Sequence, residues 1–270
     1  MTDRLVFDIG RPLIMAHRGE SGSIPENTKA ALDSATGVGV DVIESDVRLT
    51  KDNQIVLFHD DDLIRTTGEL GTIREYTLDE LLLFDLGNNF TKDNGATFPF
   101  RGKGLRIVTV RDAFERYPKT IFNLDIKDTF PAAPKELAYL ISDMDRQSSV
   151  MIASFHDSQL EQFRKLVPDV PTSAHPGEVK TFLLSTKIGL PRIRSMDIHY
   201  RAFQVPIKSG PMTIVTKKFI KKAHEHSIAV HVWTVNDEAT MERLLDLGVD
   251  GIFTDFPSIL RGVLQKRGCL

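Results

Sequence analysis

Short runs of apolar, mostly β-branched residues alternate along the chain with longer stretches whose apolar residues recur every three or four positions. The first pattern is typical of buried strands and the second of amphipathic helices. The apolar runs cover residues 13–16, 41–49, 54–59, 120–127, 149–156, 170–174, 194–199, 228–235 and 251–254. The helical stretches cover residues 26–38, 78–84, 110–117, 134–144, 158–167, 178–188, 216–225, 237–247 and 258–266. This repeated order of strand and helix predicts a parallel sheet.

About eight such units in one chain are what a (β/α)8 TIM barrel requires. No linker-like tract rich in Pro, Gly, Ser or charge divides the sequence of 270 residues. We therefore predict a single α/β barrel over residues 11–267. The alternative is a doubly wound sheet, which usually carries a glycine-rich first turn. The sequence contains no GxGxxG or Walker motif.

Residues 61–106 interrupt the alternation of strands and helices. They are polar and rich in turn-forming residues, with only one or two helical turns. A segment of this length exceeds a normal loop between strand and helix. We predict a small insertion on the rim of the barrel, after the second strand region.

Composition narrows the class of protein and its compartment. The chain has 34 Lys and Arg against 37 Asp and Glu, a net charge of −3, which argues against a nucleic-acid partner. Its one cysteine, Cys269, excludes an internal disulfide and fits a reducing compartment. No stretch has the length and apolar character of a signal peptide or membrane span. We expect a cytoplasmic protein without a transmembrane segment; peripheral membrane contact and the oligomeric state stay open.

Carboxylates gather at the predicted strand ends, where a barrel carries its functional residues. Glu44 and Asp46 stand two apart on one strand, so both point to the same face. Two carboxylates inside a barrel repel each other unless a cation compensates them. A hard divalent ion is the simplest compensation, with Asp125 on another strand as a third oxygen ligand. The alternative is that Glu44 and Asp46 form ion pairs with Arg18, Arg48 and Lys127.

Two histidines also end strands. His17 and His59 are each followed by a charged residue, and their side-chain type titrates near neutral pH. Such a pair could divide the work of general acid and general base. The alternative is that each histidine is a structural residue.

Trp233 is the only tryptophan and shares one strand face with His231 and Val235. If this face points inward, the indole can form an apolar wall of a binding site. Packing in the barrel core is the alternative interpretation.

Five blocks of sequence carry a family resemblance. MAHRGESGSIPENTKAAL resembles the opening signature of the glycerophosphodiester phosphodiesterase family, and VIESDVRLTKDNQIVLFHD resembles its metal-binding and histidine segment. IFNLDIK, VHVWTVND and LLDLGVDGIFTDFP are similar to later blocks, in the same order. The resemblance covers residues 13–260, and it implies a TIM barrel.

The resemblance also implies roles for individual residues. It makes His17 and His59 the catalytic acid and base, without assigning which is which. It makes Arg18 and Lys127 phosphate-binding cations, and Glu44, Asp46 and Asp125 ligands of a divalent metal, Mg²⁺ or Ca²⁺. At position 125 many relatives have Glu. The shorter Asp changes the reach by about 1.5 Å, so the ion could be held through a water or by a shifted strand.

The implied reaction is hydrolysis of a glycerophosphodiester to sn-glycerol 3-phosphate and an alcohol, within lipid and glycerol metabolism. Either water or the adjacent glycerol hydroxyl could attack phosphorus, the second route passing through a cyclic phosphate. One alternative is a lysophospholipase D, favoured by the phenylalanines of the predicted insertion (Phe84, Phe90, Phe98 and Phe100). A remote alternative is a barrel that binds phosphate esters without turnover.

Overall fold

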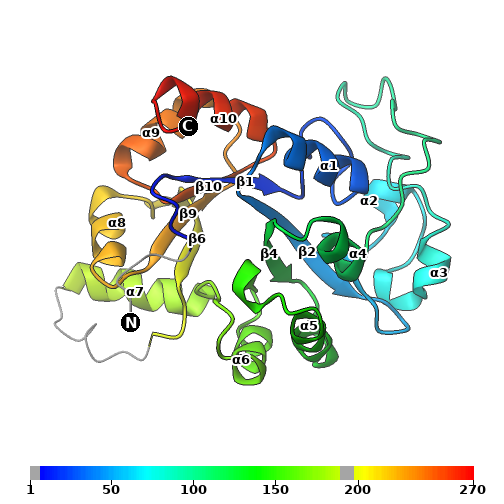
Figure 1. The fold of residues 1–270 in the computed structure, drawn as a ribbon, viewed down its shortest axis with the longest axis horizontal. Helices are drawn as coiled ribbons and strands as arrows, with labels where there is room; N and C mark the ends of the chain where they lie inside the picture. Colours follow the sequence, from blue (N-terminus) through cyan, green and yellow to red (C-terminus); the bar gives the residue numbers. More distant parts are fainter. Residues whose placement is uncertain (1–6, 189–197) are drawn as a thin grey trace.

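A barrel of parallel strands forms the centre of the molecule in the computed structural model, which describes residues 7–188 and 198–270. Within these residues the parallel strands are β1 (Leu13–His17), β2 (Val42–Leu49), β4 (Ile121–Ile126), β5 (Val150–Ala153), β6 (Ala202–Pro206), β9 (Ala229–Trp233) and β10 (Gly251–Thr254). They are hydrogen-bonded in the order β5, β4, β2, β1, β10, β9, β6 (Figure 1).

The two outer strands of this order, β5 and β6, are joined by the extended segment 171–174. Parallel bridges connect Thr172 to Ile152 of β5 and Ser173 to Ala202 of β6. The segment takes the place of an eighth strand, as the apolar run 170–174 indicated. The predicted TIM barrel is confirmed.

Helices cover the outside of the barrel (Figure 1). They are α1 (Lys29–Val38), α4 (Val110–Arg116), α5 (Ala132–Asp143), α6 (Asp157–Leu166), α7 (Pro176–Ile188), α8 (Lys217–His224), α9 (Glu238–Leu247) and α10 (Pro257–Lys266), with a 3-10 turn η2 (Gln147–Ser149) before β5. No helix in the described part of the chain has the length and apolar character needed to cross a membrane.

The main apolar core lies between the strands and these helices. One cluster surrounds Phe203, Val230 and Ile252, and another surrounds Phe122 and Leu124. Because side chains alternate across a strand, the residues next to these point into the barrel instead. Several of those inward positions are polar, and they become the site described below.

The start of α1 differs from the sequence prediction. The pattern predicted a helix from residue 26, whereas α1 begins at Lys29. Thr28 is the N-cap, and its hydroxyl accepts a hydrogen bond from the N–H of Ala31. Ser, Thr, Asp and Asn are preferred at this position because they satisfy a free helical N–H. The preceding residues, including Glu26, are therefore left in a loop at the barrel mouth.

The run 54–59 is not a barrel strand, which corrects the sequence prediction. It forms β3 (Ile55–Leu57), which pairs antiparallel with β2 in a register that places Leu57 opposite Val47. Asn53, with φ of 61°, allows the tight return between the two strands. The N–H of Phe58 then donates to the carbonyl of Asp46 at 2.9 Å. This hairpin brings His59 back over the barrel mouth.

Residues 61–106 contain the short elements α2 (Ile64–Thr67), η1 (Ile73–Glu75) and α3 (Leu78–Leu81). Leu63, Ile73 and Leu86 belong to a small apolar cluster that also includes Phe58. The domain boundaries, 11–267 for the barrel and 61–106 for the rim insertion, stay predictions.

The strand before β9 also differs from the prediction. Residues 194–197 of the predicted strand 194–199 lie outside the described residues, and barrel strand β6 occupies Ala202–Pro206. In this strand Phe203 and Val205 are buried in the outer core, whereas Gln204 lines the barrel cavity. The sequence signal was weak because Gln204 and Pro206 interrupt the apolar run. A short hairpin of β7 (Lys208–Ser209) and β8 (Met212–Thr213) follows β6.

Candidate active site

One cavity opens at the mouth of the barrel, with a volume of about 770 Å³. All eight side chains that the sequence predicted for a site line it: His17, Arg18, Glu44, Asp46, His59, Asp125, Lys127 and Trp233. They come from the carboxyl ends of several strands, where barrel enzymes carry their functional groups. The structure therefore gathers residues that are more than two hundred positions apart in the chain into one place.

The register of β1, β2 and β4 aligns the carboxylates. Glu44 is opposite His17 of β1, and Asp46 is opposite Asp125 of β4. Glu44, Asp46 and Asp125 all face the cavity, as their period of two and their pairing require. They are 7%, 2% and 6% exposed, so these carboxylates are largely removed from water.

Arg18 turns sharply away from the end of β1. Its φ of 57° lies in the left-handed region, which is uncommon for a residue other than glycine. Its N–H donates to the carbonyl of Glu44 at 2.8 Å, and Nε lies 3.0 Å from Oδ2 of Asp46. Nη1 donates to Oε1 of Glu26 at 2.9 Å. Burial alone would lower the pKa of Arg18, but Asp46 and Glu26 raise it, so the guanidinium stays charged.

Lys127 is the second cation of the site. Its Nζ donates to Oδ2 of Asp125 at 2.7 Å and lies 3.1 Å from Oδ1 of Asp46. Burial alone would lower the pKa of Lys127, yet these two carboxylates raise it. Arg48, the third cation proposed as an ion-pair partner, contacts Asp61 at 2.7 Å instead.

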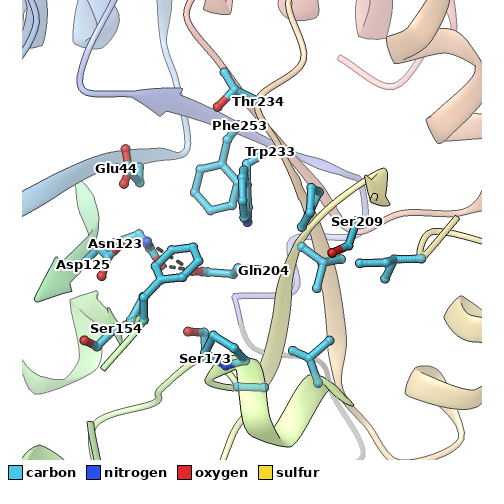
Figure 2. A pocket seen from close by; sticks show the side chains of 18 of the residues that line it. Glu44, Asn123, Asp125, Ser154, Ser173, Gln204, Ser209, Trp233, Thr234 and Phe253 are labelled. Carbon is cyan, nitrogen blue, oxygen red and sulfur yellow. Dashed lines mark hydrogen bonds between the residues drawn. The ribbon is translucent and has the colours of Figure 1, made fainter. Parts of the chain in front are cut away.

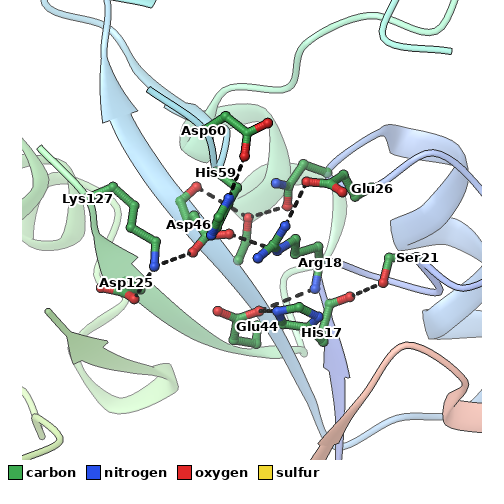
Figure 3. A network of polar contacts seen from close by, with 12 residues as sticks. His17, Arg18, Ser21, Glu26, Glu44, Asp46, His59, Asp60, Asp125 and Lys127 are labelled. Atoms are coloured by element: carbon green, nitrogen blue, oxygen red, sulfur yellow. Dashed lines mark hydrogen bonds and ion pairs between the residues drawn. The ribbon is translucent and has the colours of Figure 1, made fainter. Parts of the chain in front are cut away.

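The three carboxylates differ in their charge balance. Burial, with the adjacent charge of Asp46, raises the pKa of Glu44 above its usual value. Burial also raises the pKa of Asp125. Burial by itself would raise the pKa of Asp46 as well, but Lys127 and Arg18 hold it below its usual range. Three buried carboxylates thus face two cations, and the site holds an excess of acidic groups (Figure 3).

The fit of this site to a divalent metal rests on its oxygen donors. Among residues 7–188 and 198–270, no three His, Cys, Asp or Glu side chains are already arranged as a metal centre. Oδ1 of Asp125 is nevertheless buried without a hydrogen-bond partner. An unpartnered buried carboxylate oxygen is costly, and a hard cation is the ligand that would satisfy it. The carboxylates of Glu44, Asp46 and Asp125 therefore fit a hard divalent ion in type and burial.

Each of the two predicted histidines is held by a carboxylate through its Nδ1 atom. For His17 the partner is Asp255, with 2.6 Å between Nδ1 and Oδ1. Burial alone would lower the pKa of His17, but Glu44 and the bond to Asp255 raise it above its usual value. Burial opposes ionisation of Asp255 too, and the bond from His17 still lowers the pKa of Asp255 to about 2. His17 Nε2 lies 3.9 Å from Oε2 of Glu44, on the cavity side.

His59 has the same arrangement on the opposite side of Arg18 (Figure 3). Its Nδ1 lies 2.7 Å from Oδ1 of Asp60. A carboxylate on Nδ1 fixes the ring orientation and the tautomer, which leaves Nε2 for exchange of a proton. Both rings are therefore oriented with the same nitrogen available.

The other half of the cavity is apolar. It is lined by Val179, Leu183 and Leu184 of α7 and by Ile214 after the β7–β8 hairpin. Trp233 lies between the two halves, in edge contact with Phe155 at 5.9 Å between ring centroids. Figure 2 shows Trp233 beside Phe253 at this wall. The sequence left open whether the indole is a wall of a binding site or part of the barrel core. It lines the cavity and also packs against the apolar cluster of Phe253, so both descriptions apply.

Several residues of the site were not predicted. Asp255 follows β10 at its carboxyl end, so a search of every strand end could have found it. Phe155 likewise follows β5, and Lys127 Nζ lies 5.2 Å from its ring centroid. Asn123 and Gln204 are joined across the cavity at 2.6 Å (Figure 2). Nothing in the sequence pairs them, because β4 and β6 are not neighbours.

The phenylalanines of the predicted insertion lie elsewhere. Phe84 packs on Tyr76, Phe90 packs on Phe100, and Phe98 lies under Arg101. None of the four is among the described residues that line the cavity. The sequence argument that used them for an apolar substrate was therefore wrong about its residues.

A TIM barrel with paired histidines, two cations and buried carboxylates at the ends of its strands has the organisation of an enzyme that acts on an anionic substrate. Comparison with protein families specifies this class further. The model of the "Glycerophosphoryl diester phosphodiesterase family" matches residues 17–259. The chain belongs to this family, and the family and enzyme class predicted from its motifs are confirmed.

Individual relatives span nearly the whole chain. A glycerophosphodiester phosphodiesterase of Bacillus altitudinis is 34% identical over 248 residues, which cover 90% of this chain and 94% of the relative. A human lysophospholipase D is 29% identical over 275 residues, covering 93% and 86%. A phosphodiesterase of Oleispira antarctica, solved in complex with the product sn-glycerol-3-phosphate, has a TM-score of 0.73 and 24% identity, covering 94% of this chain and 97% of that one. The last comparison shows the shared fold.

Proposed function

We propose that this chain hydrolyses glycerophosphodiesters to sn-glycerol 3-phosphate and an alcohol. His17 and His59 act as the acid and base, and Arg18 and Lys127 bind the phosphate. The observation that carries the proposal is the paired arrangement of the histidines. Each has Nδ1 on a carboxylate, at 2.6 Å and 2.7 Å, and both line the same cavity.

The histidines act on opposite sides of the bound phosphate. One Nε2 accepts the proton of the attacking water or glycerol hydroxyl, and the other, protonated, donates to the leaving alcohol oxygen. Asp255 and Asp60 stabilise the positive charge that forms on each ring in turn. These carboxylates also keep the two rings from rotating, so that each nitrogen is in place before the reaction.

Arg18 and Lys127 bind the non-bridging oxygens of the phosphate. Both cations also contact Asp46, Arg18 through Nε at 3.0 Å and Lys127 through Nζ at 3.1 Å. A phosphodiester adds a further negative charge to three carboxylates that face two cations. We therefore propose that Glu44, Asp46 and Asp125 hold a divalent ion, Mg²⁺ or Ca²⁺. When bound, this ion would supply electrostatic stabilisation of the charge on the phosphoryl oxygens.

A second candidate function is that of a lysophospholipase D, in which the diester keeps one acyl chain. The apolar half of the cavity favours it, with Val179, Leu183 and Leu184 beyond Trp233. The name of the human relative, lysophospholipase D, is consistent with it. In both functions Trp233 is the wall against which the apolar part of the substrate packs.

The experiment that tests the proposal is a product assay with the purified chain, Mg²⁺ or Ca²⁺, and two substrates. Glycerophosphocholine tests the first function, and lysophosphatidylcholine tests the second. Release of choline from glycerophosphocholine with formation of sn-glycerol 3-phosphate supports the proposed function. Binding of both compounds without turnover would instead favour the non-catalytic barrel.

We also propose a cytoplasmic location. The single cysteine, which excludes an internal disulfide in this chain, supports it. Fractionation of the cells that make the protein tests this proposal.

A further inference from the structure

Arg65 of α2 joins two carboxylates, Glu26 and Asp60, that lie beside each other at the mouth of the barrel. Its Nη1 donates to Oε2 of Glu26 at 2.8 Å and its Nη2 to Oε1 at 2.6 Å. Its Nε donates to Oδ2 of Asp60. Nε, Nη1 and Nη2 thus all donate to these two carboxylates, and the bidentate contact with Glu26 is specific in geometry.

Each of these carboxylates holds a residue of the proposed site. Glu26 accepts the bond of 2.9 Å from Nη1 of Arg18, and Asp60 accepts the bond of 2.7 Å from Nδ1 of His59. Figure 3 shows Asp60 next to His59 and Glu26 next to Arg18. A continuous path of hydrogen bonds therefore runs from the phosphate-binding cation through Arg65 to the catalytic imidazole.

The backbone under Arg65 is fixed. Thr67 of the same helical turn is only 4% exposed. The amides of Asn88 and Asn89 donate to the carbonyls of Thr67 and Ile64 at 2.8 Å and 2.9 Å. The side chain of Arg65 is 50% exposed. Its guanidinium therefore lies at the rim of the site, on a backbone that these hydrogen bonds hold in place.

The electrostatics agree with this geometry. Burial alone would raise the pKa of Glu26, but the bonds from Arg65 and the charge of Arg18 hold it below its usual value. Burial likewise opposes the ionisation of Asp60, and Arg65 and His59 lower its pKa. Both carboxylates are thus kept as anions that can accept bonds from the site residues.

We propose that Arg65 is a positioning residue that couples the orientation of His59 to that of Arg18. This proposal rests on the proposed function of the two residues. It also gives the segment 61–106 a function, because this segment places Arg65 at the rim of the barrel. A lysine at this position would keep the charge but lose the planar fork that reaches both carboxylates.

The first test is steady-state kinetics of Arg65→Gln and Arg65→Lys with glycerophosphocholine. We expect kcat to fall about 10- to 100-fold in Arg65→Gln, the scale of a small misplacement of catalytic groups, and less in Arg65→Lys. Arg74→Gln is the matched control. Arg74 lies in the same segment and bonds to Asn53 and to the carbonyl of Thr50, away from the cavity, so its variant should keep the wild-type kcat.

A double-mutant cycle separates positioning from a general loss of structure. Asp60→Asn should lower kcat by a smaller factor in the Arg65→Gln background than in the wild-type background, because the path of hydrogen bonds is already broken there. The same non-additivity should hold for Glu26→Gln, with its effect mainly on KM through Arg18. Additive effects in both cycles, or a wild-type kcat in Arg65→Gln, would overturn the proposal.

The third test does not depend on activity. In the wild-type chain the neutral imidazole of His59 should carry its proton on Nδ1, as seen in its ¹⁵N NMR signals. Arg65→Gln and, more weakly, Arg65→Lys should shift this population toward the Nε2 tautomer. Unchanged signals in both variants would contradict positioning, even if the wild-type chain failed to hydrolyse any diester.

Discussion

Asp255 accepts a hydrogen bond of 2.6 Å from Nδ1 of His17, across 238 positions of the chain. Asp255 also accepts bonds from Ser21 at 2.8 Å and from Asn236 at 2.6 Å, so its carboxylate is itself held in place. A histidine whose Nδ1–H is fixed by an anchored carboxylate is oriented for proton transfer through Nε2. The role proposed for His17 therefore depends on Asp255.

Asp255→Asn should lower kcat by at least about tenfold, because an amide at this position can donate to the ring and favour the wrong tautomer. KM should change little. The matched control is His224→Asn, which breaks a similar contact of 2.8 Å with Asp250 on the outer surface. An unchanged kcat in Asp255→Asn, measured with glycerophosphocholine, would show that His17 needs no carboxylate partner.

Chelation tests the proposed metal. Exhaustive treatment with EDTA should abolish turnover, since three buried carboxylates would then face two cations and a bound phosphodiester would add to the repulsion. Mg²⁺ or Ca²⁺ should restore activity. Full activity after chelation would favour the alternative in which Arg18 and Lys127 alone compensate Glu44 and Asp46.

Leu184 tests the apolar half of the cavity. It lines the cavity from α7 and is 50% exposed. Leu184→Asp should lower kcat/KM about tenfold for lysophosphatidylcholine, because a charge replaces apolar contact with the acyl chain. The value for glycerophosphocholine should stay unchanged. Leu166→Asp is the control, since Leu166 is similarly exposed on α6 but lies outside the cavity. Equal effects on both substrates would contradict an acyl-chain site.

His231 should make the fold sensitive to acid. It is fully buried in the barrel, neither ring nitrogen has a hydrogen-bond partner, and burial lowers its pKa to about 4. Between about pH 6.5 and 4 the unfolded chain binds a proton that the folded chain rejects. As the pH is lowered through this range, the free energy of unfolding should therefore decrease, by up to about 3 kcal/mol from this residue.

Urea unfolding at pH 7.5 and at pH 5 measures this effect. His231→Leu should flatten the dependence on pH, whereas His199→Gln should keep it, because the side chain of His199 is already exposed in the folded chain. The same dependence on pH in His231→Leu and in the wild-type chain would assign the acid sensitivity to other groups.

Local patterns in the sequence were sufficient to predict the barrel and several of its strand-end residues, although not Asp255 or Phe155. Period-two strands and helical stretches predict the alternation, and motif position predicts that Glu44, Asp46 and His17 end up together. The direction of β3 relative to β2 was not predictable, because a parallel and an antiparallel strand have the same apolar sequence pattern. The antiparallel register of β3 on β2 and the backbone bond from Phe58 to Asp46 show that His59 returns over β2.

Contacts between segments that are far apart in the chain could not be predicted from the sequence either. The pair His17 and Asp255 depends on the closure of β1 against β10, and the pair Asn123 and Gln204 spans the barrel interior. Residue type alone gives no register between such strands. The phenylalanines of residues 61–106 were wrongly used as support for a substrate with an acyl chain, because composition does not show where a loop packs.

The central claim is that His17 and His59 carry the proton transfers of phosphodiester hydrolysis. The most direct measurement is kcat of His17→Ala and His59→Ala on a glycerophosphodiester, together with the melting temperature of each variant. We expect kcat to fall by at least about 100-fold in each, the lower end of acid and base contributions, with nearly unchanged thermal unfolding. Retention of wild-type kcat in either folded variant would contradict the claim.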